Sequence, residues 1–427
     1  MIFFYILMFT SPFYHHPFFD RGFGSFTIVK GIGAICAIYA LFYMITKGKA
    51  PNYFGTARAR LFLMICLWGL LSYVGTGALR SWAADPAFSY LSFLVLFLVT
   101  LTIVDTPTKM FWSLMSALAG IAFGAMYMIR EFQKYHAIYA DLRPGAVIGD
   151  PNYYTLAALL ILPVAYFWLR GLRQEFYRYS VIGMFILVSA AVALASSRGG
   201  FLGLVAGVGY LVWTSRKRAR NAAVLFVLLA VPMLIAPRSP LKRLLHPDYA
   251  DQLGSQTREE AWRAGLKMIR AKPLTGIGLG LYKPLLGEYS GDPNFQQIAH
   301  NSYLEYAAEL GIPALLLFLW LLWATFRALD RTRKITLRSS DGFLYPMAAG
   351  LQCGIVACAV GDFFLSAEYL KLFWIVVFLS IPLERFARAR HAERGPGRQC
   401  SLRRCHRFRF QSLPASTMRR SGRKLPR

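Results

Sequence analysis

Three side chains of this 427-residue chain have the types needed for catalysis on an anionic substrate: Arg198, Arg258 and His300. Arginine binds phosphate well because its planar guanidinium group can donate two parallel hydrogen bonds. Histidine can take a proton from a hydroxyl group near neutral pH. Together these residues suit the binding of a diphosphate and the activation of a hydroxyl nucleophile, provided that the fold brings them to one face.

His300 stands at the edge of a helix-like segment, 296-QQIAHNSYLEYAAELGIPALLLFLWLLW-323. Ser302-x-x-Glu305 is a capping box, which predicts a short helix that begins there and ends at Gly311. His300 therefore precedes a partly positive helix end, which favours the neutral imidazole that a base requires. A lone histidine is more often an ordinary loop residue, so its role depends on its neighbours. On the same helix, three residues at intervals of four share a face and are predicted to support the site: Asn301, Glu305 and Glu309.

Arg258 lies in 255-SQTREEAWRAGLKMIRAKPLTGIGLGLY-282. Thr257-x-x-Glu260 is a second capping box and predicts a helix that begins at Arg258 and ends at Lys272-Pro273. One predicted face is mostly apolar, and a basic stripe lies beside it, which is typical of an amphipathic helix on a membrane surface. The first stripe is Arg258, Trp262, Leu266 and Ile269, and the second is Arg263, Lys267 and Arg270.

Arg258 is the first residue of the mostly apolar stripe. It is either a snorkelling arginine, with its charged group at the membrane–water interface, or an arginine that binds an anion, and spacing alone favours neither interpretation. The glycines of 276-GIGLG-280 follow a helix and a proline rather than a strand, so a plain turn is a better interpretation than a phosphate cradle. Arg198, in 195-ASSRGGFLGL-204, lies between two apolar runs. A charge at this depth is costly and is usually paired or functional, although a simple turn between spans is the alternative.

Long apolar runs must position these residues, since 56% of the chain is hydrophobic and only 16% is charged. This composition predicts an all-α polytopic membrane protein with about 12 transmembrane helices and one large outer loop containing short helices. The predicted spans are 2–12, 26–46, 60–79, 88–104, 110–130, 153–169, 180–196, 199–213, 221–236, 311–326, 344–361 and 369–386. The first run is either a short span or a half-buried segment.

The net charge of +27 is better explained by topology than by nucleic-acid binding. Fourteen of the 48 Lys and Arg residues lie from Arg385 onward, and most others fall in short segments between the apolar runs. Under the twelve-span arrangement these basic segments share the cytoplasmic side with both termini. Arg198, Arg258 and His300 then face the opposite side.

Several motifs resemble the bacterial O-antigen ligase family: 149-GDPNYYT-155, SSRGG after an apolar span, REEAW and PLTGIGLG in a long loop, and HNSYLEYAAELGIPA. The resemblance covers about Asp150 to Leu317. It implies a glycosyltransferase of the bacterial inner membrane, with its active site facing the periplasm. The donor would be an undecaprenyl-diphosphate-linked glycan, and the acceptor a glycan or lipid A–core sugar. The family's catalytic arginines and histidine carry over onto Arg198, Arg258 and His300.

The apolar runs, the alternation of basic segments and the composition of the tail, together with the resemblance, give the organisation of the chain. Residues 1–236 form an N-terminal transmembrane bundle, 237–300 a periplasmic catalytic loop, 301–386 C-terminal transmembrane helices, and 387–427 a basic, disordered cytoplasmic tail in contact with membrane lipids. Residues 1–386 are expected to form one membrane fold.

We expect a metal-independent, inverting transfer without cofactors, because no D-x-D pair is present to bind a divalent cation. Three other activities stay open. The first two, an O-antigen or exopolysaccharide polymerase and a protein O-oligosaccharyltransferase, belong to the same family. The third is a membrane transporter or flippase, although the chain shows no internal repeat of the kind that transporters carry. A purely architectural membrane protein would not explain why these arginines and the histidine gather on one face.

Overall fold

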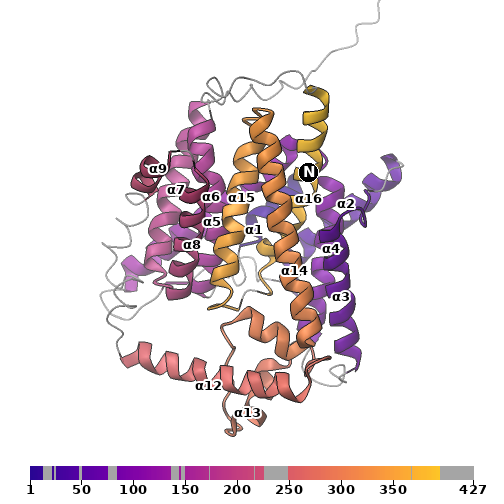
Figure 1. The fold of residues 1–427 in the computed structure, drawn as a ribbon, viewed down its shortest axis with the longest axis vertical. Coiled ribbons are helices and arrows are strands. Elements are labelled where there is room, and N and C mark those ends of the chain that lie inside the picture. Colours follow the sequence, from indigo (N-terminus) through magenta and orange to yellow (C-terminus); the bar gives the residue numbers. More distant parts are fainter. Residues whose placement is uncertain are drawn as a thin grey trace, which may run out of the picture.

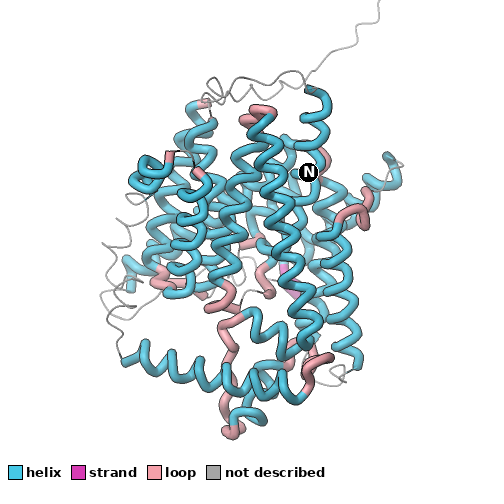
Figure 2. Tube along the Cα trace, viewed as in Figure 1, coloured by secondary structure: helices cyan, strands magenta, loops and turns pink. Residues whose placement is uncertain are grey.

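The computed structural model describes residues 1–12, 22–23, 26–47, 51–75, 84–135, 144–145, 150–172, 174–215, 217–225, 249–366 and 368–394. This part of the chain is almost entirely helical (Figures 1 and 2). The helices are α1 Ile2–Thr10, α2 Ile28–Lys47, α3 Ala57–Gly75, α4 Ala84–Ile103, α5 Pro107–Tyr135, α6 Pro151–Gly171, α7 Glu175–Leu194, α8 Arg198–Thr214, α9 Arg218–Leu225, α12 Tyr249–Ala271, α13 Tyr282–Ser290, α14 Ser302–Arg338, α15 Leu344–Gly361 and α16 Lys371–Arg394. Two short antiparallel strands, β1 Gly22–Phe23 and β2 Phe26–Thr27, precede α2.

Seven of the described helices are long and apolar enough to cross a membrane, and α4 contributes a shorter apolar stretch, Ala87–Ile103. The seven are α2, α3, α5, α6, α7, α14 and α15. This confirms a helical, multi-span membrane protein, whereas the count of twelve spans stays a prediction. Most of the expected span 221–236 lies outside the described residues. Helix α1 has nine residues, about 14 Å of helix, which is short for a hydrocarbon core of about 30 Å.

Glycines let the central helices approach closely. On α15, an added Cβ at Gly350 or Gly354 would meet the backbone of α6 at Val164 and Leu160. On α8, an added Cβ at Gly203 would lie 2.6 Å from the Ala357 carbonyl oxygen of α15. Small residues at such spacing allow backbone-to-backbone packing inside a membrane, where van der Waals contact drives association. The close packing of α8 against α15, and of α15 against α6, therefore fixes the position at which α8 begins.

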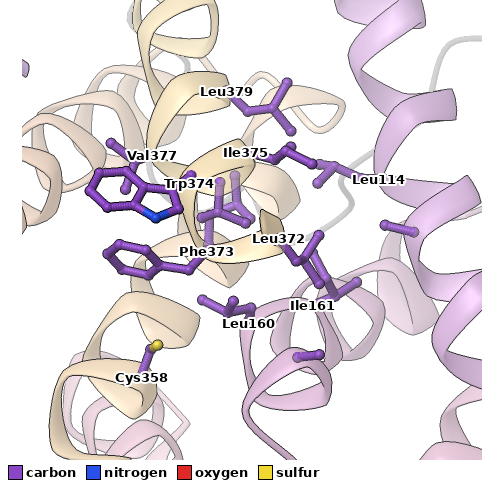
Figure 3. Packing of buried hydrophobic residues seen from close by; sticks show 14 of the residues in the cluster. Leu114, Leu160, Ile161, Cys358, Leu372, Phe373, Trp374, Ile375, Val377 and Leu379 are labelled. Atoms are coloured by element: carbon purple, nitrogen blue, oxygen red, sulfur yellow. The ribbon is translucent and has the colours of Figure 1, made fainter. Parts of the chain in front are cut away.

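Around this centre the bundle is filled by large apolar side chains. Trp374 and Phe373 of α16 are 1% exposed and lie beside the α6 and α15 side chains in Figure 3. Ile161 of α6 and Leu114 of α5 are also buried in this cluster. These large side chains fill the middle of the bundle with apolar contacts.

Basic residues gather at one end of the bundle. Arg58 of α3 and Arg331 of α14 both pair with Glu384 of α16, and Arg390 pairs with Asp341 at 3.1 Å. Helices α12 and α13 lie at the opposite end, where α12 crosses below the bundle in Figure 1. This separation agrees with the expectation that the basic clusters and the long loop face opposite sides of a membrane.

Two predicted helix boundaries differ from the structure at the far end of the bundle. Helix α14 continues to Arg338, so the basic cluster after residue 326 lies on a helical extension rather than in a loop. Helix α16 continues to Arg394, into the segment predicted to be a disordered tail, and residues 395–427 lie outside the described part. In both cases helix-forming residues follow the apolar run without a breaker, and the helix continues past it.

The predicted break at Gly311 is confirmed. Gly311 has φ 83° and ψ 170°, and it separates an N-terminal segment of α14 from the long span that Pro313 begins. An added Cβ at Gly311 would collide with the Leu274 carbonyl. The Ile312 N–H donates to the Pro273 carbonyl at 2.8 Å. Residues 302–310 therefore form a separate short helical segment packed against the loop.

Candidate functional site

His300 has a left-handed backbone conformation, with φ 50°. This region is unfavourable by about 1–3 kcal/mol for a residue other than glycine, and it persists only where neighbouring contacts enforce it. Both main-chain polar groups of the preceding residue, Ala299, form hydrogen bonds. The Ala299 N–H donates to Glu305 Oε1 at 2.9 Å, and the Ala299 carbonyl accepts from the Trp262 indole at 2.6 Å. Ala299, and with it the main chain at His300, is thus held from α14 by Glu305 and from α12 by Trp262.

On the other side of His300, the residue that caps α14 is Asn301 rather than Ser302. Its side chain accepts the N–H groups of Tyr303 and Leu304, each at 3.1 Å. The predicted capping box was wrong because Ser302 is occupied elsewhere, since its hydroxyl donates to the Leu365 carbonyl at 2.9 Å. The expectation that His300 directly precedes a helix N-terminus is confirmed.

Arg198 begins helix α8, which Ser197 caps by accepting the Gly200 N–H at 3.1 Å. Gly200 leaves room for Thr155 of α6, so two of the motifs quoted above touch each other. Gly199 lies against Phe364 in the loop after α15, where an added Cβ would be 2.6 Å from the Phe364 Cβ. The start of α8 is therefore fixed between α6 and the α15–α16 loop.

Helix α12 links the two arginines and the histidine. Arg198 Nη2 donates to Ser255 Oγ at 3.4 Å, and Trp262 donates to Ala299, the neighbour of His300. Ser255, Arg258 and Trp262 are spaced i, i+3, i+7 and share one face of the helix. Arg258 therefore stands between the two contacts, which are about 10 Å apart along the axis. All three predicted site side chains are partly buried.

Helix α12 is longer than predicted, since it is already formed at Tyr249 and contains Thr257 in its interior. The Thr257 hydroxyl bonds back to the Gly254 carbonyl at 3.2 Å instead of capping a terminus. The predicted end before Lys272-Pro273 is confirmed.

The buried face of α12 is also displaced from the predicted stripe. It consists of Ala261, Ala264 and Met268, while Leu266 is 48% exposed. These buried residues form a separate small core with α13 and α14. The buried side of α12 thus packs on protein, and a position of this helix on a membrane surface stays a prediction.

The glycine turn at 276–280 binds a carboxylate of the chain itself. Glu309 accepts the N–H of Gly280 at 2.8 Å and that of Tyr282 at 3.1 Å. Gly276 has φ 70°, and an added Cβ would collide with the Glu309 carbonyl. The plain-turn interpretation is correct, and Glu309 serves to dock the loop on α14. Among the predicted supporting residues, Asn301 and Glu305 lie close to His300, and Glu309 lies one turn further away.

The loop 362–370 between α15 and α16 was missed from the sequence. Its Phe363 ring packs edge-on against Trp262 at 5.9 Å, and its Leu365 carbonyl binds Ser302. The segment 362-DFFLSAEY-369 carries acidic residues in a short connection, which is the one signal that could have drawn attention to it. Among the described residues, no group of three or more His, Cys, Asp or Glu side chains is placed to hold a metal ion.

The fold and site define a multi-span helical membrane protein with two arginines and a histidine gathered at one end of its bundle. Residues 183–319 match the family model described as O-antigen ligase, which confirms the family resemblance. The match includes Arg198, Arg258 and His300. The matched segment is therefore similar to the O-antigen ligase or polymerase-type family of membrane glycosyltransferases and supports a relation to it. A comparison with curated proteins gives no significant match.

Proposed function

We propose that this protein transfers a glycan from an undecaprenyl-diphosphate carrier to an acceptor hydroxyl at the periplasmic face of the inner membrane. Arg198 and Arg258 bind the diphosphate, and His300 is the base. The observation that carries the proposal is the bridging position of α12, which contacts Arg198 through Ser255 and the neighbour of His300 through Trp262.

In the proposed reaction, His300 takes the proton of the acceptor hydroxyl as its oxygen attacks C1 of the donor sugar. The bond between C1 and the phosphate oxygen breaks, and undecaprenyl diphosphate leaves with the electron pair. Arg198 and Arg258 stabilise the negative charge that develops on that oxygen, with guanidinium groups already in place. Attack from the face opposite the leaving group inverts the anomeric configuration.

The partly buried position of the three side chains supports this assignment. A diphosphate bound there loses part of its water, which strengthens its attraction to the arginines. Hydrogen bonds of the neighbouring residues Ala299 and Asn301 fix the main chain at His300. A base that must reach a single proton needs such a fixed position.

The test is a transfer assay with purified protein in lipid vesicles, a labelled lipid-linked glycan and candidate acceptors. We expect a new glycosidic product together with free undecaprenyl diphosphate, and a loss of about 10²–10⁴ in rate for His300→Ala. If the labelled donor only moves from one leaflet of the vesicle membrane to the other, without forming a product, the protein is a transporter. Supplying lipid A–core, a second carrier-linked repeat or a protein acceptor in separate reactions distinguishes the ligase from the polymerase and the protein glycosylation enzyme.

A further inference from the structure

Two carboxyl groups that each have a buried oxygen atom, those of Glu305 and Glu368, lie near each other, and Glu305 binds Ala299, the residue before His300. Glu305 of α14 is 5% exposed, and Glu368 comes from the loop that leads into α16. The two carboxyl groups are close enough to influence each other's ionisation, and the Ser366 hydroxyl also acts on Glu305. Neither carboxyl group takes part in the proposed transfer chemistry. Their position is nevertheless fixed, because the Glu368 carbonyl accepts the buried Trp374 indole N–H at 2.8 Å.

The pair has a hydrogen-bonding deficit when both groups are ionised. Within the described residues, the Oε2 atoms of Glu305 and Glu368 are buried and make no hydrogen bond, and the Ser366 hydroxyl makes none either. Two carboxylates have no hydrogen to share, and like charges at this depth repel strongly. One retained proton removes the repulsion and supplies the missing hydrogen bond, as it does in other paired carboxyl groups.

The surroundings favour that proton on Glu368. Burial and then the charge of Glu305 raise the pKa of Glu368 well above its ordinary value. Glu309 of α14 acts on Glu368 in the same direction. Lys371 is the nearest basic residue along the chain.

We propose that Glu305 and Glu368 form a carboxylic acid–carboxylate pair that positions His300: Glu368 donates its hydrogen to Glu305 Oε2, and Glu305 Oε1 accepts the Ala299 N–H. The hydrogen bond from Glu368 fixes the Glu305 carboxylate. That carboxylate holds Ala299 by its N–H, and the Ala299 carbonyl binds Trp262, so the pair orients the next residue, His300, which carries the imidazole. This inference rests on the proposed role of His300 as base.

The test compares Glu368→Gln, which keeps a donor, with Glu368→Met, which keeps only volume. Misplacing a catalytic group by about 1 Å can cost about 10² in rate. We therefore expect Glu368→Met and Glu305→Ala to lower kcat by roughly 10- to 100-fold with a donor KM within about twofold of wild type. Glu368→Gln should stay within about threefold of wild type. Gln352→Met, which removes another fully buried polar side chain, in helix α15, is the matched control and should leave kcat unchanged.

A second readout does not depend on activity. Hydrogen–deuterium exchange of a peptide covering residues 296–303 should be faster in Glu368→Met and Glu305→Ala than in wild type, and unchanged in Glu368→Gln. Equal exchange and equal kcat in the Gln and Met variants would overturn the inference while leaving the base assignment intact. Failure of the proposed function shows separately, as absent transfer by wild type or full transfer by His300→Ala.

Discussion

Trp262 and Ala299 are joined by a hydrogen bond in which the indole N–H donates to the main-chain carbonyl, 2.6 Å away. The two residues lie 37 positions apart, on α12 and immediately before His300. Since Arg258 lies one turn before Trp262 on the same helix face, this bond fixes the spacing between the proposed diphosphate ligand and the proposed base.

Replacing Trp262 with Phe should therefore slow transfer while preserving the fold, because Phe keeps a ring against Phe363 but loses the donor. One hydrogen bond contributes about 0.5–1.5 kcal/mol, which corresponds to a fall of roughly 2- to 13-fold in kcat/KM. Trp320→Phe is the matched control, since Trp320 is 55% exposed on α14. Equal rates for the two variants would show that the indole N–H has no part in positioning.

The orientation of the chain predicts opposite labelling of two engineered cysteines. Asn294 is exposed in the loop after α13, whereas residue 416 belongs to the basic tail. In a background without the native cysteines, Asn294→Cys should react with an impermeant thiol reagent in whole cells with a permeabilised outer membrane, and Ser416→Cys should react only after lysis. The reverse pattern would place the loop in the cytoplasm and contradict the proposed site orientation.

Much of the fold could be predicted because apolar runs of helical length have few alternatives in a membrane. The position of His300 before a helix could also be predicted, since a polar cluster followed by helix formers and a Gly-x-Pro break marks both ends of the short segment. The gathering of Arg198, Arg258 and His300 at one end followed from the alternation of basic segments along the chain.

What could not be predicted depends on contacts between distant residues. Ser302 fits a capping box locally, but its hydroxyl is engaged by Leu365, and the adjacent Asn301 caps the helix instead. The glycine turn is explained only by Glu309, 29 residues after Gly280. The start of α12 was misplaced because Thr257 and Glu260 imitate a terminus within a sequence that is already helical upstream.

Chelation should leave transfer unchanged, because in the proposed mechanism the leaving diphosphate is neutralised by guanidinium groups. The measurement is product formation in EDTA and in added magnesium or manganese, with a metal-dependent glycosyltransferase assayed in parallel to show that chelation is complete. A loss of activity in EDTA that either metal restores would exclude charge neutralisation by arginine alone.

Substitutions of Arg258 should affect the donor rather than the acceptor. Arg258→Ala removes a cation next to the leaving group, so we expect kcat to fall about 10²–10³-fold and the KM for the lipid-linked donor to rise. Arg258→Lys restores the charge but not the two parallel hydrogen bonds, so it should recover only part of the loss. The acceptor KM should change little in both variants.

Arg263→Ala provides a control on the same helix. Arg263 is exposed, and it pairs with Glu259 at 2.6 Å on a face that does not contact the site, so its loss removes the same charge from α12 without touching the proposed diphosphate position. Surface ion pairs of this kind contribute about 0–1 kcal/mol to stability, and the fold should tolerate the change. If Arg258→Ala and Arg263→Ala reduce transfer equally, the effect is one of overall charge, and Arg258 does not bind the leaving group.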